Sequence, residues 1–292
     1  MIEEQLLATG PADLPVPAQR PGLLRRALRQ TRGRIGLGVL LAVVALSVAG
    51  PWIAPHSPYD FVAMPFQPPD AVTWLGADNM GRDVLSRILN GGWILMTMAL
   101  SATALAMLAG TVLGLVAGYA GGRTDAVIMR LLDVVLAVPE RVLVLMFVSV
   151  IGANQVILTL ATGLVFIPSI ARTARAATMD IVRNEYVEYA EAIGMSRWQL
   201  LRDEILPNVT TPLMVEAGFR LTWSIGLITG ISFIGFGTQP PTPEWGLMIN
   251  ESRDGLLFQP WAVVAPILCI AAFVIGVNLL ADAIARAAGR TE

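Results

Sequence analysis

The side chains that usually carry enzyme chemistry are almost missing from this sequence of 292 residues. It has one histidine (His56), one cysteine (Cys269) and no lysine, so all 20 of its basic residues are arginine. A phosphate-binding G-x-x-x-x-G-K-[ST] loop needs a lysine, and a His/Cys zinc site needs three or four such ligands. His56 lies in the proline-rich stretch APHSPYD, where a solvated loop histidine is a simpler interpretation than a catalytic triad. We therefore expect no catalytic residue, no metal site and no cofactor in this chain.

Charge is concentrated in one stretch of an otherwise apolar chain. Charged residues make up 14% of the sequence, yet nine lie between Asp180 and Glu204, six of them acidic and three arginine. The spacing predicts a first helix with an apolar face opposite its glutamates. Apolar residues at helical spacing form that face: Tyr186, Tyr189, Ala190 and Ile193.

A turn and a second helix are predicted directly after this first helix. Gly194 would end the first helix, because glycine tolerates the left-handed backbone conformation found past helix ends. Ser196 and Gln199 form an S-x-x-Q capping box for the second helix. That helix would place Trp198 on an apolar side and would end at Pro207. The stretch is thus predicted to be two short helices around a glycine.

Three interpretations of this predicted pair of helices can be compared. The spacing of Ala190 and Gly194 also occurs in helix-turn-helix DNA binders, but DNA binding needs a basic footprint and this stretch is acidic. We therefore expect no nucleic acid partner. A solvated loop without a partner is the second possibility. A docking element for another protein is favoured, because no other part of the chain is expected to cover the apolar face.

The rest of the sequence indicates a polytopic membrane protein. Hydrophobic residues make up 55% of it, and a bilayer core takes about 20 helical residues. Six apolar segments follow, at 35–54, 93–120, 126–151, 155–171, 211–237 and 261–285. Most are long enough to span with tilt, and the fourth is the weakest because it is short and interrupted by Pro168. With the N-terminus in the cytoplasm, fifteen arginines fall inside and three outside, as the positive-inside rule requires. We expect an all-α protein with six transmembrane helices and both termini cytoplasmic.

The predicted organisation follows from these segments. A cytoplasmic tail at 1–34 is followed by a first transmembrane helix at 35–54 and an extracytoplasmic segment at 55–92. A five-helix core at 93–286 and a cytoplasmic tail at 287–292 complete the chain. The core contains a cytoplasmic loop at 178–210 and an extracytoplasmic loop at 238–260. Within the core, glycines recur every four residues from Gly110 to Gly122. Such a stripe lets another helix approach closely, either from the same chain or from a partner subunit.

Ionisable residues inside membrane segments are functional candidates, since burying charge in a bilayer is costly. Arg130 and Asp133 are spaced as a helix-surface pair near the inner boundary. Glu140 and Arg141 follow Pro139 nearer the middle of the third segment. They are candidates for the lining of a translocation path, the alternative being pairing with a neighbouring subunit.

The polar loop resembles the EAA motif of ABC importer permeases. In that motif E-A-A is followed after three residues by Gly, and after nine more by I-x-L-P. Here the motif begins at Glu188, continues through Ala190 and Gly194 and ends at Leu206 and Pro207; Tyr189 replaces the middle alanine and Glu204 the isoleucine.

Three further stretches are similar to the dipeptide, oligopeptide and nickel class of these permeases. They are WLGADNMGRDVLSRILNGG (74–92), GLVAGYAGGRTDAVIMRLLDVVLAVP (114–139) and SFIGFGTQPPTPEWGLMINESRD (232–254). The resemblance covers residues 35–286 and implies the type I importer permease fold in a bacterial inner membrane.

The resemblance also implies partners and site residues. Partners would be a second homologous permease, two ATPase subunits or one fused ATPase that bind ATP and Mg²⁺, an extracytoplasmic substrate-binding protein, and membrane lipid. Coupling to the ATPase would use Glu188, Ala190, Gly194, Met195, Ser196, Leu206 and Pro207. Contact with the partner permease or binding protein is expected at Asp78, Arg82, Asp83 and Trp245. Di- or oligopeptides are the expected cargo, with glutathione or a nickel chelate as the alternative and a stand-alone secondary transporter as a less favoured one.

Overall fold

The computed structural model describes residues 23–289, which form helices joined by loops. The predicted all-α class is therefore confirmed for this part of the chain. Five long helices make up the bundle: α3 (Thr31–Ile53), α4 (Val84–Ala120), α7 (Gln155–Val182), α10 (Leu206–Phe233) and α12 (Trp261–Gly289). Shorter elements are α2 (Leu23–Arg29), α5 (Gly122–Leu136), α6 (Glu140–Ile151), α8 (Glu185–Ala192), α9 (Arg197–Gln199), the π-helix η1 (Leu200–Ile205), α11 (Trp245–Ser252) and the 3₁₀ turn η2 (Arg253–Gly255).

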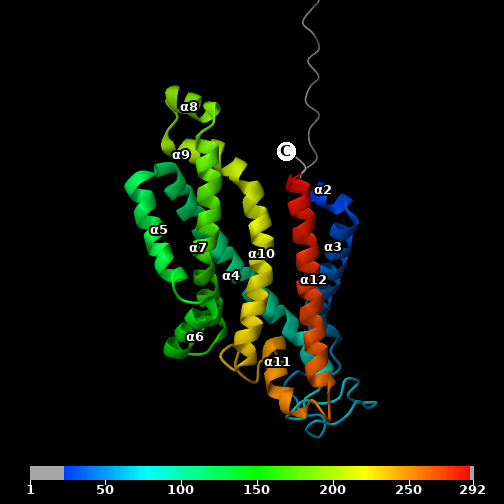
Figure 1. Ribbon diagram of the computed structural model, residues 1–292. Helices are drawn as coiled ribbons and strands as arrows, with labels where there is room; N and C mark the ends of the chain where they lie inside the picture. The colour runs from blue at the N-terminus through cyan, green and yellow to red at the C-terminus, as the bar shows by residue number, and fades with distance from the viewer. Residues whose placement is uncertain (1–22, 290–292) are drawn as a thin grey trace, which may run out of the picture.

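The bundle has two distinct ends (Figure 1). Helix α2, the C-terminal end of α12 and the α8–α9 pair lie at one end, and α11 with the coil that joins α3 to α4 lies at the other. Among the described helices, four are long and apolar enough to cross a membrane, or five if α5 and α6 together form one span. This count falls short of the six predicted spans, and α10 is the long helix that does not meet these criteria.

The predicted third segment, 126–151, is not one straight helix. Helices α5 and α6 meet at an angle of 80°. Pro139 lies at the break and is the N-cap of α6. Proline has no backbone N–H to donate and disfavours helical conformation in the residue before it, so the helix ends there and restarts in a new direction.

Several helices extend beyond the predicted membrane segments. The first long helix begins at Thr31 and α4 at Val84, so helix replaces part of the predicted N-terminal tail and of the outer segment. Helix α7 continues to Val182, beyond the predicted end of its segment. Helix α4 starts early because the Asp83 carboxylate caps it, accepting a hydrogen bond of 3.0 Å from the backbone N–H of Ser86. Residues 1–22 and 290–292 of the predicted tails lie outside the described residues.

The glycine stripe of α4 packs against α7 of the same chain. A Cβ at Gly110 would lie 2.8 Å from the side chain of Ile170, one at Gly114 would lie 2.5 Å from Ala174, and one at Gly118 would lie 2.7 Å from Thr178. Of the two interpretations of this stripe, packing within the chain is therefore confirmed. Gly122 does not continue the packing, because a Cβ there would meet nothing within 4 Å.

Replacing Gly114 by valine is expected to destabilise the bundle by about 1–3 kcal/mol, because the added atoms overlap the backbone of α7. Thermal unfolding in detergent, followed with a thiol-reactive dye at Cys269, measures the effect. Gly38→Val is the matched control, since a Cβ at Gly38 would meet nothing within 4 Å. Equal melting temperatures for the two variants would contradict the α4–α7 packing.

Candidate functional site

The acidic stretch folds as predicted around Gly194. Helix α8 ends at Ala192, and Gly194 has a φ of +89°, in the left-handed region. The backbone N–H of Gly194 bonds to the carbonyl of Glu191 at 3.0 Å, and that of Met195 bonds to the carbonyl of Ala190 at 3.2 Å. These bonds satisfy carbonyls that the helix end would otherwise leave free. The helix–glycine turn–helix prediction is confirmed.

The capping box at the start of the second helix is also confirmed. The backbone N–H of Gln199 bonds to Ser196 Oγ at 3.4 Å, and Gln199 Oε1 accepts from the backbone N–H of Ser196 at 3.0 Å. The predicted end of this helix at Pro207 is wrong. The chain runs from α9 through η1 into α10 without a break, and Pro207 lies in the first turn of α10, where its missing N–H is tolerated.

The apolar residues of this loop divide between two faces. Val187 and Ala190 of α8 are buried against the chain itself. Tyr189, Ile193 and Trp198 are 68%, 61% and 72% exposed. We call these last three side chains the docking face. Exposed aromatic and aliphatic side chains in this number are typical of a surface that a partner covers.

The predicted coupling residues occupy different environments. Glu188, Gly194, Ser196 and Pro207 are exposed, Met195 and Leu206 are half-buried, and Ala190 is buried. The side chain of Ala190 is therefore covered by its own chain and is not available for direct contact. The side chains that sequence reasoning placed beside it on one apolar face, Tyr189 and Ile193, point outward instead.

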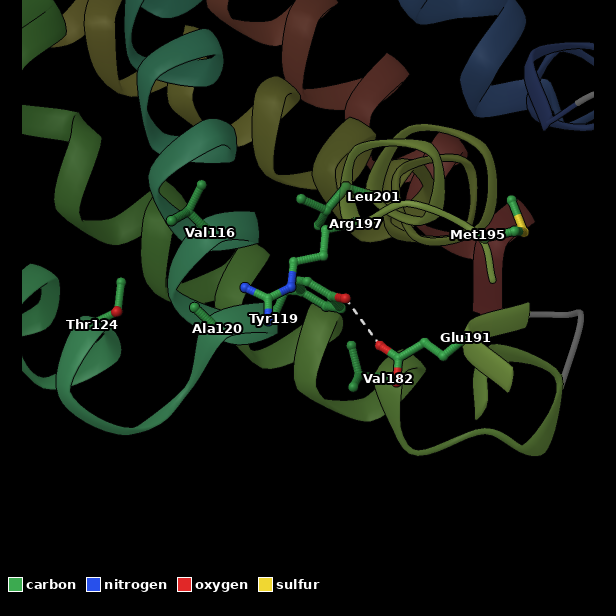
Figure 2. Close-up of a pocket in the computed structure, with 9 residues that line it drawn as sticks. All are labelled: Val116, Tyr119, Ala120, Thr124, Val182, Glu191, Met195, Arg197 and Leu201. Carbon is green, nitrogen blue, oxygen red and sulfur yellow. Dashed lines mark hydrogen bonds between the residues drawn. The ribbon is translucent and has the colours of Figure 1, made fainter. Parts of the chain in front are cut away.

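Two hydrogen bonds tie α8 to the long helices. Tyr119, in the last turn of α4, donates from its hydroxyl to Glu191 Oε1 at 2.9 Å, and Asn208 Nδ2 of α10 donates to the hydroxyl of Tyr186 at 3.3 Å. Figure 2 shows the first of these beside a cavity of about 800 Å³. Its lining includes Val116, Tyr119, Ala120, Thr124, Val182, Glu191, Met195, Arg197 and Leu201. Sequence reasoning missed Tyr119, because no local pattern relates it to a residue so distant in the chain.

The charged pair proposed for a translocation path lies at the start of α6. Glu140 is its first residue, and Arg141 is exposed and lines a cavity of about 260 Å³ against Gly226 and Gly230 of α10. No salt bridge joins either side chain to another described residue. Arg141 thus borders an open space and has no salt-bridge partner among the described residues.

Other charges near the membrane core are paired. The expected pairing of Asp133 with Arg130 is wrong, since Asp133 accepts from Arg172 of α7 at 2.5 Å. Glu216 and Arg220 of α10 lie 2.6 Å apart, and the guanidinium of Arg220 lies 5.5 Å from the centre of the Phe166 ring. The Glu216–Arg220 pair was not predicted from the sequence, because Glu216 lies in no distinguishing motif.

The outer residues that we expected to contact a partner are buried in this chain. Arg82 bonds to Asp78 at 2.7 Å and to Glu251 at 3.1 Å. Arg87 lies 2.7 Å from Glu251 and 3.4 Å from Asp78. We call these four side chains the outer ion network. The network joins the coil before α4 to the end of α11. Its members pair closely because buried charges require opposite charges close by.

Asp83 and Trp245 are buried too. Asp83 caps α4, and His56 lies beside it, with His56 Nδ1 at 3.6 Å from Asp83 Oδ2; the histidine is half-buried rather than solvated. Trp245 donates from Nε1 to the carbonyl of Ile88 at 3.0 Å. The side chains of Asp78, Arg82, Asp83 and Trp245 therefore shape the outer end and offer no exposed contact surface.

A buried carboxylate holds the start of α11. Glu244 accepts hydrogen bonds from the backbone N–H groups of Gly246 at 2.8 Å and Leu247 at 2.9 Å. Burial raises the pKa of the Glu244 carboxyl, while these N–H groups act in the opposite direction. Together with Trp245, this cap fixes α11 against α4.

Comparison with known proteins agrees with this architecture. Residues 110–290 match the family described as binding-protein-dependent transport system inner membrane component, and residues 23–69 match the N-terminal transmembrane domain of oligopeptide transport permease C. The fold is similar to that of an inward-facing MetNI methionine ABC transporter, with a TM-score of 0.56 and 16% identity over 69% of this chain and 96% of that one.

Two bacterial relatives are similar over most of their length. The glutathione transport system permease protein GsiD of Pectobacterium atrosepticum is 35% identical over 262 residues, covering 88% of this chain and 86% of that protein. The di/tripeptide transport system permease protein DppC of Pseudomonas aeruginosa is 34% identical over 254 residues, covering 85% and 84%. The resemblance to importer permeases is thereby confirmed, and the chain belongs to the family of binding-protein-dependent transport system inner membrane components.

Proposed function

We propose that this chain is one of two permease subunits of an ATP-driven importer of di- or oligopeptides. The observation that carries the proposal is the docking face of Tyr189, Ile193 and Trp198, presented by two helices around Gly194 at one end of the bundle. A permease that hydrolyses no ATP itself needs such a surface to receive movement from an ATPase. The relatives support peptide cargo, since one is named a di/tripeptide permease.

The membrane topology is part of this proposal. We infer six spans, with α5 and α6 as a broken span and α10 as a span that carries the Glu216–Arg220 pair. Both termini and the α8–α9 loop would be cytoplasmic. Support comes from the arginine distribution and from the placement of α2, the end of α12 and α8–α9 at the same end of the bundle.

The partners follow from this arrangement. A second homologous permease would complete the translocation path, and two ATPase subunits or one fused ATPase would bind ATP and Mg²⁺ below the docking face. An extracytoplasmic binding protein would deliver substrate to the end that holds α11. Glu140 and Arg141 would line the path in this half. The open space that Arg141 borders beside Gly226 and Gly230 supports this role, because an arginine without a salt-bridge partner among the described residues can bind a peptide carboxylate.

Glutathione is a second candidate cargo. It is itself a small peptide, and the 35% identical permease of Pectobacterium atrosepticum is named for its transport. Uptake of labelled dipeptide and labelled glutathione by cells that express the complete importer separates the two cargoes.

Docking of an ATPase is tested by replacing Trp198 with glutamate. The chain carries an affinity tag and is purified from membranes of cells that express its whole transport system. We expect the co-purified ATPase to fall at least tenfold, because truncating or charging a central tryptophan of an interface typically costs about 2 kcal/mol or more.

Leu257→Glu is the matched control for this experiment. Leu257 is 92% exposed and lies in the loop between α11 and α12, at the opposite end of the bundle. We expect this variant to retain its ATPase. A wild-type chain that transports peptide without any ATPase bound would favour a stand-alone secondary transporter and would overturn the proposal.

A further inference from the structure

The hydrogen bond between Tyr119 and Glu191 is unlike the other contacts that hold α8. In the described part of the chain, α8 is tied to long helices by two side-chain hydrogen bonds, one to Asn208 and one to Tyr119. Asn208 belongs to α10, which continues directly from the loop through α9 and η1. A bond to Asn208 therefore joins the loop to its own exit helix.

Tyr119 instead joins the loop to a helix that does not continue from it, α4. It lies in the last turn of α4, 72 residues before Glu191 in the chain. Helix α4 packs closely along α7 through Gly110, Gly114 and Gly118. Interfaces packed this closely shift as units rather than deform. A force on Glu191 is thus passed to the centre of the bundle through the tyrosine hydroxyl.

The surroundings of this bond leave room for movement. The cavity of about 800 Å³ lies among the end of α4, the start of α5 and the loop (Figure 2). Glu191 is exposed, so the bond can open to water without leaving a buried charge. Arg197, which follows the Gly194 turn in the sequence, lines the same cavity. A movement of Glu191 away from α4 can therefore break this bond without leaving a buried polar group unpaired.

We propose that Tyr119 is a positioning residue of the transport cycle: its hydroxyl holds Glu191, and with it the docking face, in the resting position from which the ATPase displaces it. The proposal rests on the proposed function, because it needs an ATPase on the docking face. Loss of the bond lowers the cost of leaving the resting position. The population then shifts toward the displaced loop even without substrate.

The test uses the tagged complex purified from membranes and placed in lipid nanodiscs, with ATP alone as the probe. In Tyr119→Phe we expect basal ATP hydrolysis to rise about three- to tenfold, the ratio that one net hydrogen bond contributes. The expected change is in kcat, with the KM for ATP unchanged, because the nucleotide site lies in another chain. Glu191→Ala should give the same rise, and the double variant should add nothing further.

Two further variants separate positioning from general loosening of the loop. Glu191→Gln keeps an acceptor oxygen for the tyrosine hydroxyl and should keep the low basal rate of ATP hydrolysis seen in the wild type. Tyr186→Phe makes the same chemical change at the bond to Asn208 and should leave the rate unchanged. The inference is overturned if Tyr119→Phe hydrolyses ATP at the wild-type basal rate, or if Tyr186→Phe gives an equal rise. A wild-type chain that purifies without ATPase would instead refute the proposed function.

Discussion

Replacing Arg87 by methionine is expected to lower the free energy of unfolding by about 3–5 kcal/mol, among the largest effects available in this chain. Arg87 is fully buried and lies within salt-bridge distance of both Asp78 and Glu251. Methionine fills much of the space but carries no charge. The carboxylates of Asp78 and Glu251 would then face the single guanidinium of Arg82, and the uncompensated negative charge is the source of the cost.

Thermal unfolding in detergent, followed at Cys269, measures this loss. Arg253→Met is the matched control: Arg253 also forms an ion pair, with Asp254 at 3.6 Å, but its side chain is 57% exposed. Exposed pairs contribute about 0–1 kcal/mol, so the control should melt close to the wild type. Adding Glu251→Gln to Arg87→Met should recover part of the loss, because it removes one of the unpaired charges. If both arginine variants melted alike, the outer ion network would not stabilise the fold.

Replacing Gly194 by valine is expected to abolish coupled transport while the bundle stays folded. Gly194 has a φ of +89°, and a Cβ there would meet nothing within 4 Å. The penalty is therefore conformational rather than a collision, and a β-branched residue in this region costs about 1–3 kcal/mol. The turn would relax to another backbone conformation and rotate α8 relative to α9. ATP hydrolysis would then no longer drive uptake, whereas the melting temperature should change little.

Peptide uptake and ATP hydrolysis in proteoliposomes, together with thermal unfolding, test this expectation. Gly194→Asn should retain much of the activity, because asparagine tolerates positive φ better than other non-glycine residues. Gly152→Val is a control for strain alone: Gly152 has a φ of +124° and open space around it, at the end of α6. We expect that variant to transport. Coupled uptake by Gly194→Val at the wild-type rate would contradict a role for the turn in coupling.

The features that the sequence predicted well depend on neighbours along the chain. The capping box of Ser196 and Gln199 and the turn at Gly194 are short-range effects of hydrogen bonding and backbone sterics. The end of the second helix was mispredicted at Pro207, because the π-helical turn before α10 brings the proline into a first helical turn.

The sequence by itself determined that the chain is an apolar helical protein with one acidic helix–turn–helix loop, since composition and local spacing decide these features. Only the tertiary structure decided which helix the glycines of α4 meet, that Arg82 and Arg87 both pair with Glu251, and that Tyr119 holds Glu191. Each of these contacts joins residues far apart in the chain. Their existence depends on which helices pack side by side, and no local pattern of residues specifies that arrangement.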